Sequence, residues 1–216
     1  MSMKTPVLQE TDHGLVLAEG DMELICDFTR LLPRVQADAL NRELLVRAAK
    51  IRDFGGKALA LDATAGLGED SFLLAAAGFQ VELFEYNEII AALLRDGIKR
   101  GLEDPALRDI VSRMHLNEEN SIKAMQRKDL QPDLILLDPM FPRRNTSGIS
   151  KKKLQMFKQL ERPCEEEQEM LEAALGLRPY KIIVKRPLKG PCLGDRKPGY
   201  SIEGKTIRYD CLVFPR

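Results

Sequence analysis

The sequence predicts an α/β fold: a mainly parallel sheet with helices on both faces, a C-terminal antiparallel strand, and a short N-terminal hairpin and helix. First, from residue 58 onward short apolar runs alternate with amphipathic stretches of helical spacing, as in parallel α/β sheets. Second, only two or three residues separate the last two apolar runs, which therefore must pair antiparallel. Third, 216 residues with 44% apolar and 31% charged side chains are typical of a folded globular protein.

The N-terminal part of the chain differs in pattern from the rest. We expect residues 1–52 to form an appendage and residues 53–216 to form the main domain. The first dozen residues look irregular. Alternating apolar and polar residues then predict a hairpin that pairs residues 15–18 with residues 22–26. Apolar residues at helical intervals predict one helix over residues 36–51.

The main domain is expected to build its sheet from seven short strands. They fall at residues 58–61, 81–84, 114–116, 134–137, 181–184, 201–205 and 208–214. Helices are expected between them, at residues 70–77, 88–101, 121–127, 153–160 and 165–175. In sheets of this kind ligands bind at the carboxyl ends of the strands, so the residues that follow each strand are the first candidates for a site.

Composition and spacing exclude several classes of protein. The longest charge-free apolar stretches, such as residues 71–81, are much shorter than the roughly 20 residues that span a bilayer. The first residues lack the apolar core of a secretory signal, so we expect a cytoplasmic protein. Four cysteines without a CxxC pair and two histidines predict neither a zinc site nor a disulfide framework. No Ser/His/Asp or Cys/His signature indicates triad hydrolysis.

The segment ALALDATAGLG, residues 58–68, joins the first strand of the main domain to a helix. Its small residues would let a ligand approach the backbone, with the helix N-terminus facing that ligand. The segment is not the dinucleotide fingerprint G-x-G-x-x-G, and its acids would repel a phosphate. We therefore expect a ligand with a positive or hydroxylated end; a purely structural turn is the alternative. The candidate residues are Asp62, Thr64, Gly66, Gly68, Glu69 and Asp70.

Glu85 stands at the end of the second strand, in VELFEYNE. In nucleotide-binding α/β folds an acid at this place accepts hydrogen bonds from the ribose hydroxyls. Glu85 is therefore the expected adenosine anchor, with Tyr86 beside the base. The alternative is an exposed acid in the first turn of the next helix.

The segment DLILLDPMFP, residues 133–142, is an apolar strand that ends in an acid, a proline and an aromatic ring. Asp138 and the carbonyl of Pro139 could accept hydrogen bonds from an exocyclic amine while Phe141 stacks on the base. Holding both N–H groups makes the amine nitrogen more nucleophilic, which is what amine methylation requires. A strand followed by a proline-rich turn is the alternative.

In this order and spacing the three segments resemble class I S-adenosylmethionine-dependent methyltransferases, with their Rossmann-like fold. With KKKLQMFKQL after the third segment and IIVKRP in the next strand, the chain looks like the RsmJ family of small-subunit ribosomal RNA guanine-N2 methyltransferases. The resemblance covers roughly residues 57–212. It implies S-adenosylmethionine as cofactor, S-adenosylhomocysteine as product, no metal, and the N2 amine of a guanine in small-subunit (16S) rRNA as methyl acceptor. The family's cofactor-binding positions fall on Glu69, Asp70, Glu85, Tyr86, Asn120, Ser121 and Asp138.

A basic surface is expected around the acceptor site. Residues 1–130 contain 16 basic and 22 acidic side chains, whereas residues 131–216 contain 17 and 11. Phosphate contacts supply most of the sequence-independent affinity for RNA. With no Trp and four Tyr, recognition is expected through shape, phosphate contacts and one flipped base. A solvated face balanced by the acidic run 165–169 is the alternative. The candidate RNA-binding residues are Arg143, Arg144, Lys151, Lys152, Lys153, Lys185 and Arg186.

Three other functions stay open at this point. The nearest is methylation of adenine N6 in DNA or RNA, because an acid-Pro-x-aromatic loop serves both bases. A second is a non-catalytic protein that binds S-adenosylmethionine or RNA. A nicotinamide-dependent oxidoreductase is the third, disfavoured because the dinucleotide fingerprint is missing.

Overall fold

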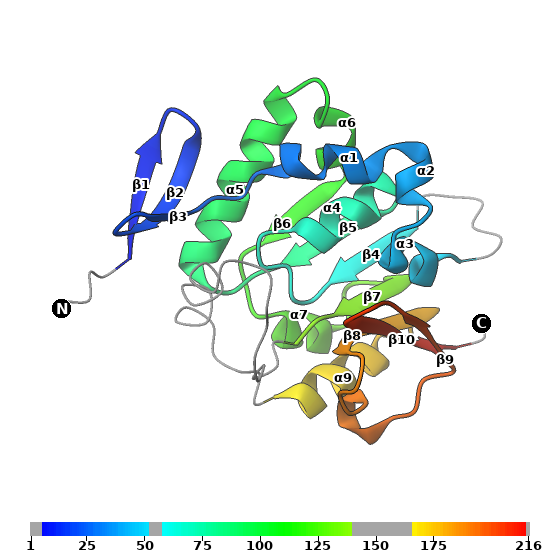
Figure 1. The fold of residues 1–216 in the computed structure, drawn as a ribbon. Helices are drawn as coiled ribbons and strands as arrows, with labels where there is room; N and C mark the ends of the chain where they lie inside the picture. The colour runs from blue at the N-terminus through cyan, green and yellow to red at the C-terminus, as the bar shows by residue number, and fades with distance from the viewer. Residues whose placement is uncertain (1–5, 52–57, 140–165, 215–216) are drawn as a thin grey trace.

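The computed structural model describes residues 6–51, 58–139 and 166–214. In these residues seven strands form one sheet in the order β6-β5-β4-β7-β8-β10-β9 (Figure 1). β6, β5, β4, β7 and β8 are parallel, while β10 runs antiparallel to both of its neighbours. The predicted fold class is confirmed. The strands are β4 Leu59–Asp62, β5 Gln80–Phe84, β6 Met114–Asn117, β7 Leu134–Leu137, β8 Lys181–Pro187, β9 Tyr200–Glu203 and β10 Ile207–Val213.

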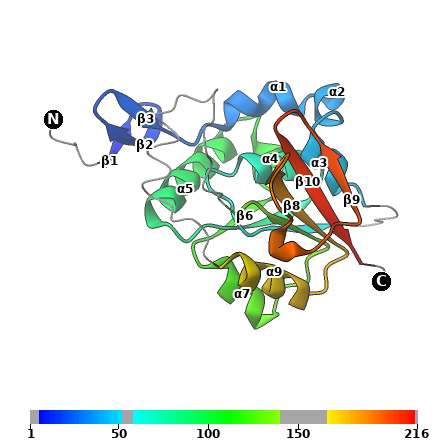
Figure 2. The ribbon, with the colours of Figure 1, turned by 60° about the horizontal axis from the view of Figure 1, so that its bottom comes forward.

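Alternation of side chains along the central strands builds two cores, one on each face of the sheet. In β4, Ala60 belongs to one core and Leu61 to the other. Figure 2 shows the sheet between the two helical layers. The larger layer contains η1 Phe28–Leu31, α1 Leu32–Val35, α2 Ala37–Leu40, α3 Leu44–Ala49, α4 Glu69–Ala76, α5 Glu88–Glu103 and α6 Arg108–Val111. The smaller layer contains α7 Ser121–Arg127, α9 Glu167–Gly176 and η2 Leu193–Asp195.

A separate three-stranded antiparallel sheet lies at the N-terminal end (Figure 1). Its strands are β1 Val7–Thr11, β2 Gly14–Glu19 and β3 Met22–Leu24. The predicted hairpin is present as β2 and β3, but β1 contradicts the irregular start that we expected. Every residue of β1 is exposed, so its sequence has no buried face to produce a recognisable alternation. The small sheet is attached to α5, where the Leu15 N–H donates to Asp96 at 3.0 Å.

The single helix predicted over residues 36–51 is wrong. The chain forms two short helices, α2 and α3, because Glu43, the residue before α3, has extended backbone. The break at Glu43 is held by a two-pronged ion pair, in which Arg34 donates to both carboxylate oxygens at 2.8 Å. The apolar residues therefore lie on two short helices instead of one, and α3 buries Leu45 against the core.

Other elements follow the sequence closely or lie beyond what it could indicate. α7 and β7 have the predicted bounds. The short elements α6 and η2 were not predicted, because four and three residues are too few to show a helical period. The helix predicted over residues 153–160 lies outside the described residues. Within the described part of the chain no helix is long and apolar enough to cross a membrane.

Candidate active site

The sequence candidates converge on the carboxyl ends of four neighbouring strands, β5, β4, β7 and β8. Asp62 is the last residue of β4, Glu85 follows β5, and Asp138 follows β7. Parallel strands end at the same edge, so the loops that leave them meet there.

Asp62 lies beneath the first loop with a side chain that is 1% exposed. One carboxylate oxygen accepts from the Ser71 hydroxyl at 2.6 Å, and the other accepts from the Thr64 N–H at 3.1 Å. Burial raises the pKa of Asp62 to about 7, although both hydrogen bonds act against this rise. Asp62 therefore holds the loop in place, and it would affect a ligand only through the loop backbone.

Thr64 connects the first loop to the third. Its hydroxyl oxygen accepts from the backbone N–H of Asp138 at 2.8 Å. The same hydroxyl lies 3.5 Å from the Asp62 carboxylate. A threonine at this place, where a dinucleotide fold has glycine, therefore ties the end of β4 to the end of β7.

The glycine turn and Glu85 form one hydrogen-bonded unit. The Gly66 N–H donates to one Glu85 oxygen at 3.1 Å, and the Asn87 N–H donates to the other at 2.8 Å. Burial raises the pKa of Glu85, and the backbone donors oppose the rise. A carboxylate oxygen can accept more than one hydrogen bond. A ribose with two neighbouring hydroxyls fits this carboxylate.

Position 68 requires a glycine. Its φ is +75°, and a Cβ there would lie 2.8 Å from Leu94 Cδ1. The N-terminal segment packs behind the same turn: the Cys26 thiol donates to the Leu67 carbonyl at 3.3 Å. Phe28 also stacks on Phe72 with ring centroids 5.1 Å apart. The first part of the chain thus supports the loop from the side opposite the site.

The central ionic contact of the site joins three residues from three elements. The Lys185 ammonium lies 2.7 Å from an Asp70 oxygen and 2.9 Å from an Asp138 oxygen. Burial alone would lower the pKa of Lys185, but the two carboxylates outweigh it and the net change is strongly upward. Lys185 is therefore a charged bridge between the start of α4 and the loop after β7.

This geometry argues against the RNA contacts expected of Lys185 and Arg186. Lys185 is committed to two carboxylates inside the site. Arg186, the next residue, points to the other face of the sheet because successive strand residues alternate. Its side chain is 1% exposed, its Nε donates to the Pro191 carbonyl at 2.8 Å, and it pairs with Glu167 at 3.5 Å. It holds the loop after β8 and cannot reach a phosphate from there.

The remaining cofactor candidates surround the same edge. Glu69 opens α4 beside Asp70. Tyr86 is 61% exposed directly after Glu85. Asn120 caps α7 by accepting from the Lys123 N–H at 3.0 Å, and Ser121 is buried at the start of that helix. Pro139 is buried after Asp138. The candidates Phe141, Arg143, Arg144, Lys151, Lys152 and Lys153 lie outside the described residues.

Two contributors to the site were not identified from the sequence, and a third was expected in another role. Ser71 holds Asp62, Phe28 supports the glycine turn, and Lys185, expected at the RNA surface, bridges two acids. For Lys185 a signal existed, because it stands near the end of the strand that neighbours β7. Phe28 has no such signal, because only the tertiary structure brings it to α4.

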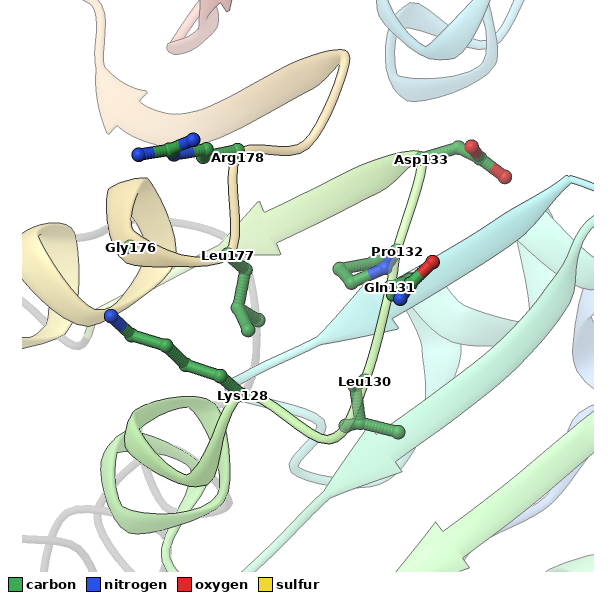
Figure 3. Close-up of a pocket in the computed structure, with 8 residues that line it drawn as sticks. All are labelled: Lys128, Leu130, Gln131, Pro132, Asp133, Gly176, Leu177 and Arg178. Carbon is green, nitrogen blue, oxygen red and sulfur yellow. The ribbon is translucent and has the colours of Figure 1, made fainter.

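The hollow shown in Figure 3 lies elsewhere, at the amino ends of β7 and β8. It measures about 460 Å³ and opens between the ends of α7 and α9. Lys128 and Arg178 line it, both in left-handed backbone, and each follows a helix whose C-terminus attracts positive charge. These cations therefore complement helix ends and take no part in the site. Among the described residues no group of three or more His, Cys, Asp or Glu side chains could hold a metal ion.

Comparisons with known proteins agree with this architecture. A family model described as "Putative SAM-dependent methyltransferase" matches residues 4–214. A ribosomal RNA small subunit methyltransferase J from Pseudomonas savastanoi pv. phaseolicola is 42% identical over 216 residues, 97% of this chain and 79% of that protein. The protein of the same name from Thioalkalivibrio sulfidiphilus is 39% identical, over 98% of this chain and 86% of its own. A SAM-dependent methyltransferase structure from Neisseria gonorrhoeae superposes with a TM-score of 0.75 at 27% identity, covering 99% of this chain and 84% of that one.

These similarities extend over the N-terminal segment as well as the main sheet. They therefore include the loops after β4, β5, β7 and β8 that make up the site. The chain belongs to the family of ribosomal RNA small subunit methyltransferase J, the RsmJ family of S-adenosylmethionine-dependent methyltransferases.

Proposed function

We propose that this protein transfers a methyl group from S-adenosylmethionine to the N2 amine of a guanine in small-subunit (16S) rRNA. The observation that supports this most directly is the 2.8 Å hydrogen bond between the Thr64 hydroxyl and the Asp138 backbone. It joins the loop suited to an adenosine cofactor to the loop suited to an exocyclic amine. Membership of the RsmJ family makes ribosomal RNA the substrate to test first.

The cofactor would be held along the edge formed by the loops after β4, β5 and β6. Glu85 would accept from the ribose hydroxyls, and the backbone at Gly66 and Gly68 would allow close approach. The acids at the start of α4 suit the positively charged amino group of the methionine part. Asp62 and Thr64 would shape the loop. Tyr86, Asn120 and Ser121 would lie nearest the base.

The reaction needs an amine held in line with an activated methyl group. The bound sulfonium supplies that methyl group already activated. Asp138 and the Pro139 carbonyl would accept the two N–H groups of the guanine amine, which frees the nitrogen lone pair for attack. The Asp138 carboxylate, which Lys185 contacts at 2.9 Å, would take the proton that the nitrogen loses. Phe141 would stack on the base.

The RNA would approach over the loop that follows Asp138. We propose Arg143, Arg144 and the lysines at 151–153 as phosphate contacts, and we leave Lys185 and Arg186 out of that set. Residues 1–52 would be an appendage that supports the cofactor loop of a methyltransferase domain formed by residues 53–216. Its substrate would place the enzyme in the cytoplasm.

The test is methyl transfer from labelled S-adenosylmethionine to small subunits that lack the modification, followed by digestion to nucleosides. We expect N2-methylguanosine and S-adenosylhomocysteine. Asp138→Ala should lower turnover by at least about 100-fold, with the fold retained because the contact to Thr64 uses the backbone of residue 138. Glu103→Ala, at an exposed acid, is the control.

Each other outcome identifies an alternative. N6-methyladenosine would identify an adenine methyltransferase. Cofactor binding without S-adenosylhomocysteine would identify a non-catalytic binding protein. Near-normal turnover of the Asp138 variant would contradict the role given to its carboxylate.

A further inference from the structure

Lys185 is the feature of the site that cofactor and amine recognition leave unexplained. Its ammonium contacts one oxygen of Asp70 at 2.7 Å and one of Asp138 at 2.9 Å. The side chains of Lys185 and Asp70 are each 20% exposed, and that of Asp138 is 35% exposed. A cation here is largely withdrawn from water and has two defined anionic partners, so it is a built contact and not a solvated surface charge.

Strand register explains why Lys185 reaches both acids. β7 and β8 are parallel neighbours in which Leu137 lies opposite Val184. The next residues along the two strands are Asp138 and Lys185, so the loop acid and the strand lysine leave the sheet side by side. On its other side the lysine backbone pairs with Tyr209 of β10. The ammonium therefore belongs to a residue that is paired within the sheet, whereas Asp138 lies where the chain leaves the sheet at the end of β7.

The charges around Lys185 show what the bridge does. Two oxygens that contact one nitrogen at these distances lie within about 6 Å of each other, so without a cation between them the two carboxylates would repel each other. The buried Asp62 adds a third acid, and the carboxylates of Asp62 and Asp138 act on each other. The nearby Arg34 is committed to Glu43, and the Tyr209 hydroxyl is buried and its pKa is raised. Lys185 is a cation that Asp70 and Asp138 both contact directly.

We propose that Lys185 is a positioning residue, which holds the Asp138 carboxylate oriented toward the target amine and couples it to Asp70 on the cofactor side. This inference rests on the proposed function. Lys185 does not act as a base, because an ammonium paired with two carboxylates keeps its proton. Its effect on the reaction passes through Asp138.

The experiment compares Lys185→Met with Lys185→Arg, using Lys99→Met as a control on the exposed face of α5. Turnover, KM and the pH profile of kcat are measured with small subunits, and affinity for S-adenosylhomocysteine is measured by calorimetry. Without the cation the pKa of Asp138 rises, so the acid limb of the Lys185→Met profile should move up by about one pH unit or more. Its kcat should fall by up to about 100-fold as Asp138 loses its orientation. Affinity for S-adenosylhomocysteine should be retained at pH 8.

Lys185→Arg keeps the charge and should leave the acid limb at the wild-type pH even though its kcat falls. A wild-type kcat and pH profile in Lys185→Met would overturn the proposal. An acid limb that moves equally far in the Met and Arg variants would also overturn it. If the Met variant does not fold, the Arg variant is the test, and a wild-type kcat or a shifted acid limb in that variant would overturn the proposal. Wild-type enzyme that binds S-adenosylhomocysteine but methylates no RNA would instead overturn the proposed function.

Discussion

Asp62→Asn should change how the stability of this protein depends on pH. The amide can keep both hydrogen bonds of the carboxyl, to the Ser71 hydroxyl and the Thr64 N–H, but it cannot titrate. In the wild type, burial raises the pKa of Asp62 to about 7, whereas an unfolded Asp titrates at about 3.9. Between these values the folded chain holds a proton that the unfolded chain has lost. The free energy of unfolding therefore falls as pH rises through this window.

The size of the effect follows from the difference between the two pKa values. About three pKa units correspond to about 4 kcal/mol. We expect about half of that, ~2 kcal/mol. The effective dielectric constant at buried sites is about 20, which makes the cost of burying the charged carboxylate smaller than in a dry interior. For a chain of this length 1 kcal/mol shifts Tm by roughly 2–4 °C. Relative to wild type, Asp62→Asn should therefore gain roughly 4–8 °C in Tm between pH 4 and pH 8.

The assay is thermal and urea unfolding of both proteins across this pH range. Asp109→Asn is the control, because that carboxyl is 85% exposed. The control should follow the wild-type curve, and Asp62→Asn should gain stability relative to both as pH rises. Parallel curves for wild type and Asp62→Asn would refute the assignment of a raised pKa to this buried acid.

Two further substitutions test the backbone of the fold. Gly68→Ala should lower the free energy of unfolding by about 1–2 kcal/mol through left-handed strain and by more because its Cβ would meet Leu94, and it should weaken S-adenosylmethionine binding. Gly20→Ala is its control, with φ +63° and open space; equal losses in urea unfolding would contradict the clash. Lys128→Gly should stabilise the chain by about 0.5–1 kcal/mol, because residue 128 ends α7 with φ 58°. A lower Tm would mean that its charge at the helix end outweighs the strain.

The sequence predicted well those elements whose apolar residues are buried. β7 is buried along its whole length, and its apolar run gave the correct bounds. No signal in the sequence indicated β1, because that strand is exposed throughout. The prediction of one helix over residues 36–51 was wrong because extended backbone at Glu43 interrupts an otherwise helical spacing. Apolar spacing indicates which residues are buried, but not whether they belong to one continuous helix.

In the candidate site, too, the sequence predicted some features and the tertiary structure decided others. The order of the loops, the glycine turn and the acids after each strand could be read from the sequence, because parallel strands bring their carboxyl ends to one edge whatever the details of packing. The partners of each charged side chain could not be read from it. Lys185 and Arg186 are neighbours with the same charge, yet one bridges Asp70 and Asp138 and the other is buried against Glu167 on the opposite face. Strand alternation separates their faces, and only strand order and register bring Lys185 beside Asp138, so that choice belongs to the tertiary structure.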